Sequence, residues 1–141
     1  MDMQNGILKV GKYVIKPNTS VDTIPRDVFN VVNTKNGEVY ISKNPVELLG
    51  VNFWMTIYFE KNHIKKVELS NANEKYKINY QTMNSTILKQ LKKENNDFLL
   101  NNLGAAHKEN LSGLEYEYQW GKIMLYFDSK SAEAGIVIYY F

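Results

Sequence analysis

The fold is decided by the stretch LEYEYQWGKIMLYFD, residues 114–128, in which side chains alternate between two faces on both sides of Gly121. Strict alternation is typical of a β-strand with one packed face and one wet face. A glycine between two such runs is typical of a hairpin turn. The final apolar run, residues 136–141, indicates a third strand. We therefore expect the chain to end in a β-meander.

The pairing register within this meander follows from the loop that keeps apolar side chains opposite one another. A slip of one residue would turn every side chain to the other face. A two-residue loop at residues 120–121 sets Tyr116 opposite Leu125 and keeps the apolar positions together. The side with tyrosine and leucine is then packed, and we expect the side with Glu115 and Glu117 to be exposed.

A similar strand, turn and strand precede the meander, at residues 51–60 and 64–70. Apolar side chains occupy the odd-numbered positions of the first strand, and mostly polar or amphipathic ones occupy the even positions. A three-residue loop that ends at His63 sets Ile57 opposite Val67. Such loops commonly end in a left-handed residue, a conformation in which histidine is enriched. We therefore expect a structural role for His63.

Shorter elements complete the first half of the chain. Residues 7–16 predict a strand that is interrupted at Gly11, and residues 23–30 predict a short helix with a proline in its first turn. A brief strand is expected at residues 38–42. The polar stretch after the first hairpin can hold one extra strand, at residues 76–80.

The second half begins with a helical pattern. Apolar side chains recur at helical spacing from residue 87, after a cap at Asn84 or Ser85. Residues 95–97 predict a break between two helices, and Gly104 predicts the end of the second one. A helix pair followed by a meander therefore makes up this half.

These elements predict an α+β fold. The expected architecture is an antiparallel sheet of about five to seven strands, with two or three helices packed on one face. A chain of 141 residues corresponds to one domain. Within the domain 1–141, residues 7–80 and 84–141 would form the halves of a tandem helix-plus-meander repeat.

Composition excludes several classes of protein. The chain has no cysteine, which excludes disulfides, thiolate nucleophiles and Cys-ligated zinc. Seventeen basic and fifteen acidic residues leave a net charge of +2, too small an electrostatic footprint for nucleic acid. The start of the chain has no apolar leader, and no run of about 20 apolar residues could span a membrane. We expect a cytoplasmic monomer or homodimer that binds neither nucleic acid nor membrane.

Candidate catalytic and metal-binding residues are few. Glu115 and Glu117 lie two apart on one strand face, roughly 7 Å between their backbones, which is near the carboxylate spacing of glycosidases. A solvated strand face explains the same pair, because charged side chains belong on exposed positions. His63 and His107 are not at metal-ligand spacing. We expect no enzyme, no metal and no cofactor.

Aromatic residues on the outward side of the strands give the clearest functional signal. Large amphipathic rings rimmed by carboxylates are the usual composition of a protein-binding hot spot. The alternative is that a second layer or a neighbouring subunit covers this face. The candidate partner-binding residues are Trp54, Tyr58, Glu60, Glu115, Glu117, Tyr126, Asp128 and Tyr139.

The second half resembles two known families. Residues 87–91 and 98–104, followed by the meander with Tyr116, Tyr118 and Trp120, are similar to the helix pair and meander of the β-lactamase-inhibitor-protein-like and outer-membrane-assembly lipoprotein families. Members of that fold are small α+β units, often in tandem, that present a sheet to a protein partner. The resemblance implies a binding sheet.

In size and composition, the chain also resembles bacterial immunity proteins, including those of contact-dependent growth inhibition systems. Such proteins bind and neutralise a cognate toxin domain. Together with the outward aromatic residues, this leads us to expect that Trp54 and Tyr58 anchor a toxin on an exposed sheet face. Two alternatives stay open. One is a small enzyme or ligand-binding domain that uses Glu115 and Glu117. The other is a homo-oligomer closed through residues 136–141, an apolar edge that would need cover.

Overall fold

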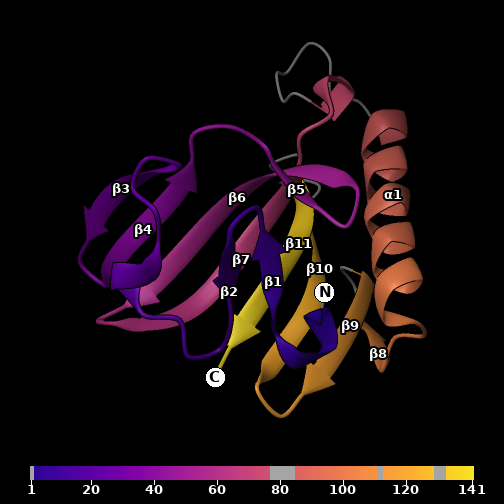
Figure 1. The fold of residues 1–141 in the computed structure, drawn as a ribbon. Coiled ribbons are helices and arrows are strands. Elements are labelled where there is room, and N and C mark those ends of the chain that lie inside the picture. Colours follow the sequence, from indigo (N-terminus) through magenta and orange to yellow (C-terminus); the bar gives the residue numbers. More distant parts are fainter. Residues whose placement is uncertain (1, 77–84, 111–112, 129–132) are drawn as a thin grey trace.

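One long antiparallel sheet organises the molecule (Figure 1), and the computed structural model describes residues 2–76, 85–110, 113–128 and 133–141. The strands are β1 (Leu8–Val10), β2 (Tyr13–Ile15), β3 (Phe29–Thr34), β4 (Gly37–Ser42), β5 (Val46–Leu48), β6 (Val51–Glu60), β7 (His63–Asn71), β8 (Lys108–Asn110), β9 (Gly113–Tyr118), β10 (Gly121–Asp128) and β11 (Glu133–Tyr140). The helices are α1 (Ser85–Leu103) and the short 3-10 helices η1 (Met3–Asn5), η2 (Val21–Thr23) and η3 (Glu74–Tyr76).

The main sheet has nine strands in the order β3-β4-β6-β7-β11-β10-β9-β8, with β5 also paired to β6. All of its pairs are antiparallel. β1 and β2 form a separate hairpin. The α+β class and the antiparallel sheet are as expected, but the described residues contain eleven strands and a single α-helix rather than five to seven strands and two or three helices.

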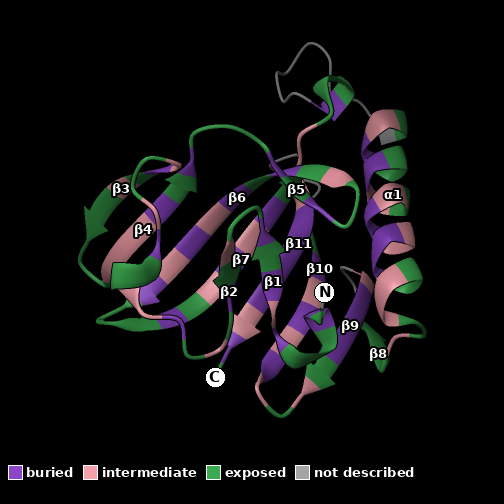
Figure 2. Cartoon of the chain, in the orientation of Figure 1, coloured by how far each residue is buried: buried purple, intermediate pink, exposed green. Residues whose placement is uncertain are grey.

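One face of the sheet is covered by α1 and by the β1–β2 hairpin. We call this the covered face. Leu8 and Ile15 of the hairpin and Leu99 of α1 share one buried core with the odd-numbered side of β6. A smaller cluster of Tyr76, Leu88 and Leu91 lies under the N-terminal half of the helix. Buried and less buried residues alternate along β6 and β7 (Figure 2), as the period of a strand requires.

The first predicted hairpin has the expected register but a shorter turn. Ile57 lies opposite Val67, as predicted. The three-residue loop is wrong: His63 already pairs with Glu60, and a register shift near the turn absorbs the extra residue. The left-handed residue is Lys61, with φ of 58°, and not His63.

The second hairpin is shifted by two residues from the prediction. Tyr116 lies opposite Ile123 rather than Leu125, and the loop comprises residues 119–120. The shift leaves every side chain on its predicted face because it is an even number of residues. Trp120 explains the difference, since its indole Nε1 donates to the Gln4 carbonyl at 2.7 Å and holds the ring in the turn.

The helix predictions were wrong at two places. Residues 23–30 form no α-helix; the end of η2 is followed by β3, because long-range pairing with β4 outweighs weak local helix propensity. The predicted break at residues 95–97 is absent, and α1 runs through it because Asn95 and Phe98 pack inward there. The predicted stop at Gly104 is confirmed, with φ of 79°.

Two larger inferences fail on this topology. No α-helix of the described residues precedes β6 as α1 precedes β8–β11, so the tandem repeat is wrong. The final strand is not an edge strand, because β11 lies between β7 and β10. A homo-oligomer that closes through this strand as a free edge is therefore excluded. The strand expected at residues 76–80 and the cap at Asn84 lie outside the described residues apart from Tyr76, which ends η3.

Candidate functional sites

The opposite side of the sheet is the open face. It consists of the side chains that point away from α1 on β4, β6, β7, β11, β10 and β9, and none of them belongs to a buried cluster of the described residues. Strand register arranges them in rows that cross the sheet. One row is Val39, Tyr58, Lys66, Tyr139, Lys122 and Glu117; the next is Ile41, Thr56, Glu68, Val137, Met124 and Glu115.

A third row of the open face carries two exposed aromatic side chains, Trp54 and Tyr126. Trp54 and Tyr126 are 46% and 40% exposed. Trp54 pairs with Ser70, Tyr126 pairs with Gly135, and a Cβ on Gly135 would lie 4.0 Å from the Ser70 hydroxyl. Three strand spacings therefore separate the two aromatic backbones, roughly 14 Å. Two small residues lie between two large rings.

A hollow of about 440 Å³ lies beside these small residues, where β7 and β11 diverge beyond the pair Leu69–Ile136. We call it the Gly135 hollow. Its open-face lining is Lys66, Glu68, Ser70, Tyr126, Gly135, Val137 and Tyr139. Glycine is required at its centre because a Cβ there would approach the Leu69 carbonyl oxygen to 2.7 Å. The hollow is large enough for one side chain of another molecule.

Tyr58, the second predicted anchor, is held more tightly than Trp54. Its hydroxyl donates to Glu68 at 3.2 Å, and the Lys66 ammonium lies 4.4 Å from its ring centre. Lys66 also pairs with Glu68 at 3.1 Å. Burial, together with the nearby Glu68 carboxylate, raises the pKa of Tyr58 to about 12. Tyr58 is therefore a neutral, positioned donor, while Trp54 and Tyr126 supply the exposed apolar area.

The Glu115 and Glu117 pair differs from the expected solvated face. Glu115 is only 5% exposed, whereas Glu117 is exposed. Lys108 lies between them, with Nζ 2.9 Å from one carboxylate and 2.6 Å from the other. Asn110 donates to Glu115 at 3.0 Å. The prediction was wrong because β8, a strand of three residues with no alternation to detect, pairs with β9 and places Lys108 beside Glu115.

This arrangement is unsuited to general acid chemistry. The hydrogen bond from Lys108 lowers the pKa of Glu115 and outweighs burial, which acts to raise it. A carboxyl group that donates a proton near neutral pH needs its pKa raised. The glycosidase-like spacing is therefore better explained as an ion-paired corner of the sheet.

The remaining predicted residues are spread along the open face. Tyr139 is half-buried between Lys66 and Lys122 in the row of Tyr58. Glu60 lies at the turn of β6, six residues from Trp54 and so roughly 20 Å from it. Asp128 pairs with Glu133 at the end of β10, and its side chain lies outside the described part. Glu60 therefore lies outside the third row, the one that contains Trp54 and Tyr126.

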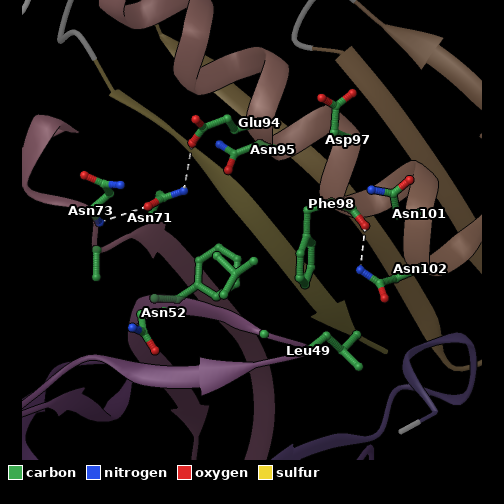
Figure 3. A pocket seen from close by; sticks show the side chains of 14 residues that line it. Leu49, Asn52, Asn71, Asn73, Glu94, Asn95, Asp97, Phe98, Asn101 and Asn102 are labelled. Atoms are coloured by element: carbon green, nitrogen blue, oxygen red, sulfur yellow. Dashed lines mark hydrogen bonds between the residues drawn. The ribbon is translucent and has the colours of Figure 1, made fainter.

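A second candidate site lies between α1 and the ends of β6 and β7 (Figure 3). It is a cleft of about 570 Å³ that contains six asparagines, and we call it the asparagine cleft. Its lining residues are Leu49, Gly50, Val51, Asn52, Phe53, Asn71, Ala72, Asn73, Glu94, Asn95, Asp97, Phe98, Asn101 and Asn102. Among the described residues that line it there is no lysine, arginine or histidine.

The cleft has a rigid apolar floor and a polar wall. Phe53 and Phe98 meet edge to face, 5.1 Å between ring centres. Asn102 donates to the Phe98 carbonyl at 2.7 Å (Figure 3). Asn95, on the same side of α1, is 1% exposed, and its Nδ2 has no hydrogen-bond partner in the described residues. An unpaired buried donor costs about 1–3 kcal/mol, so this group is poised for an acceptor.

The acidic groups of the cleft are already neutralised. Lys75 binds Glu94 at 2.9 Å, and Lys93 binds Asp97 at 2.8 Å. Burial acts to raise the pKa of Glu94, but the hydrogen bond from Lys75 and other contacts outweigh it, so the pKa is lowered. Asn71 donates to the same carboxylate at 3.5 Å (Figure 3). The cleft therefore presents amides rather than free charge.

The turn at the mouth of the cleft is unusual. Leu49 and Gly50 connect the pair Leu48–Val51, with φ of 51° and 83°. Two positive φ values define a turn in which asparagine and glycine are strongly preferred at the first position. Leucine is held there in a left-handed conformation that costs roughly 1–2 kcal/mol. Its side chain is 42% exposed.

This cleft was not predicted from the sequence, because Asn95 and Asn96 resemble a break between two helices. One signal was available: Asn95, Phe98 and Asn102 lie at i, i+3 and i+7, on one face of a helix. The lining residues outside α1 come from two distant segments, residues 49–53 and 71–73, and only the fold brings them to the helix.

No protein-family model, curated protein or solved structure matches this chain. Across the described ranges, no group of three or more His, Asp or Glu side chains is placed to hold a metal ion. The helices of those ranges include none that is long and apolar enough to cross a membrane.

Proposed function

We propose that this chain is a non-enzymatic protein-binding module that holds another protein against its open face. The observation that carries the proposal is the third row, in which exposed Trp54 and Tyr126 flank Ser70 and Gly135. Exposed aromatic rings beside a hollow, with charges around them, are typical of a binding hot spot. A partner side chain that enters the Gly135 hollow would bury both rings.

The charged residues on this face indicate that the partner is selected by shape complementarity and not by long-range electrostatic attraction. Both signs of charge are present: Lys66 and Lys122 lie among Glu60, Glu68, Glu115 and Glu117, and Lys108 of the neighbouring β8 pairs with Glu115 and Glu117. Nearly cancelling charges give little long-range attraction, so selectivity comes from fit and from local ion pairs. Glu117 is the exposed carboxylate of this set and can accept from a basic partner residue.

We further propose that the partner is a bacterial toxin domain and that the chain is its cytoplasmic immunity protein. Two things support this: the resemblance in size and composition, and a broad open face suited to covering an active surface. Capture of this kind needs no metal and no cofactor, because inhibition follows from steric exclusion.

Co-expression tests the proposal. The chain would be produced with the product of the adjacent upstream gene, and both co-purification and protection of growth would be measured. Each aromatic anchor contributes about 2 kcal/mol or more, equivalent to about 30-fold in affinity. Trp54→Ala with Tyr126→Ala should therefore lose both capture and protection.

Leu100→Ala is the matched control, because Leu100 is similarly exposed but lies on α1. It should behave as wild type. The absence of a complex with the wild-type chain contradicts the immunity proposal. Unchanged affinity of a folded double variant contradicts the choice of face.

A further inference from the structure

We infer that the asparagine cleft binds an extended, uncharged peptide segment of another protein, with its backbone on the asparagine side chains and an apolar side chain against Leu49. The inference goes beyond the proposed function because it uses a different surface. The open face can therefore fail its test while the cleft passes, and the reverse.

The carboxamide groups that line the cleft suit the backbone of a peptide. A carboxamide presents one acceptor and two donors, which is the pattern needed to bond both the N–H and the C=O of a peptide. Asn95 has an unpaired Nδ2 at the inner wall. Asn101 of α1 is exposed at the rim. Amides at two depths suit a chain that must bond at every residue.

Other ligand classes fit less well. An anionic ligand would face Glu94 and Asp97, and the lining within the described part of the chain holds no basic residue. A sugar needs an exposed aromatic platform for its apolar face, but Phe53 and Phe98 are packed against each other and at most 6% exposed. The carboxylates already hold Lys75 and Lys93, which disfavours a free cation. A neutral ligand rich in amides remains.

Dimensions agree with a short extended segment. Asn95 and Asn102 lie seven residues apart on α1, roughly 10 Å along the helix axis. That length corresponds to about three residues of extended chain. A volume of about 570 Å³ also lies within the ordinary range of binding pockets, about 300–1,000 Å³.

Leu49 supplies the apolar contact. Its left-handed backbone would be less strained with asparagine or glycine, so an exposed leucine there is unfavourable for the fold alone. Strained residues of this kind cluster at ligand clamps. At the cleft mouth, the leucine can pack on one apolar side chain of the bound segment.

The test pans a phage-displayed library of random linear peptides against the wild-type chain and measures the affinity of synthetic copies of the enriched peptides. We expect neutral sequences with one apolar position. Leu49→Asn and Asn95→Leu should each weaken binding about tenfold. Lys61→Asn is the matched control, since Lys61 is the other non-glycine residue with positive φ in the described ranges and does not line the cleft.

Several outcomes would overturn the inference. One is the absence of enrichment over an unrelated protein. Another is equal affinity for wild type and for Leu49→Asn, the variant expected to fold whatever Asn95→Leu does. A third is loss of peptide binding in Trp54→Ala with Tyr126→Ala, which would place the peptide on the open face. Retained binding in that double variant supports the cleft.

Discussion

The open face and the asparagine cleft are built in opposite ways. The open face consists of alternate residues of six strands and is broad, aromatic and edged with paired charges. The cleft collects side chains from three separate segments around a buried phenylalanine pair. This difference implies that substitutions on the open face leave the stability of the fold largely unchanged, whereas substitutions in the floor of the cleft destabilise it.

The largest expected effect tests this coupling at the cleft floor. Phe98→Ala removes a buried ring that joins α1 to β6, and the free energy of unfolding should fall by about 3–5 kcal/mol. Urea denaturation measures it. A loss below about 1 kcal/mol would mean that the cleft floor is not part of the core.

The next largest effect on stability is expected at the ion pairs that Lys108 forms with Glu115 and Glu117. Lys108→Ala leaves the buried Glu115 carboxylate with Asn110 as its remaining donor, so it should destabilise the chain more than Lys93→Ala. Lys93 is the matched control because it pairs with Asp97 on an exposed helix surface, where such pairs contribute little. Equal thermal midpoints for the two variants would show that Lys108 is dispensable.

The same ion pairs predict a pH dependence. The pKa of Glu115 is lowered in the folded chain, so its stabilisation is present above the ordinary pKa of 4.5 and is lost as pH falls through the lower folded value. The stability difference between wild type and Glu115→Gln should therefore be full at pH 7 and should shrink below about pH 4. A difference that grows towards acid pH would reverse the sign of the assigned shift.

A smaller effect of opposite sign is expected at the cleft mouth. Leu49→Asn should raise the free energy of unfolding by about 1 kcal/mol, because asparagine accepts a left-handed backbone more readily. Lys61→Asn should give a similar gain in its own turn. Only Leu49→Asn should also weaken peptide binding. If it destabilises the chain, leucine is present for packing and not for a ligand.

The smallest effect on stability belongs to the open face. Trp54→Ala should change the free energy of unfolding by no more than about 0.5 kcal/mol, although the residue removed is the largest in the row. Chemical denaturation of the isolated chain provides the measurement. A loss comparable to that of Phe98→Ala would show that Trp54 is structural.

Much of the fold could be predicted because a strand with one buried face shows its alternating pattern within its own residues. Alternation along β6 and β9–β10 identified the covered side of each strand, and the register of Ile57 with Val67 followed from it. The short strands could not be found, because three residues such as β8 carry no period. Where tertiary contacts outweigh propensity, as at β3 and at residues 95–97, local signals misled.

The candidate sites divide along the same line. The placement of Trp54 and Tyr126 outside the core was predictable, since it depends only on whether each residue has an odd or an even position in its strand. The burial of Glu115 depends on β8, and the cleft depends on the meeting of α1 with the Leu49 turn. Neither of these meetings is encoded in any one segment.

The most direct test of the central claim is nuclear magnetic resonance mapping of the chain when its co-expressed partner binds. If the open face holds the partner, the Trp54 indole N–H and the backbone amides of Ser70, Tyr126 and Gly135 should shift most, while the amides of the β1–β2 hairpin stay in place. Shifts confined to that hairpin, with the aromatic row unchanged, would contradict that claim.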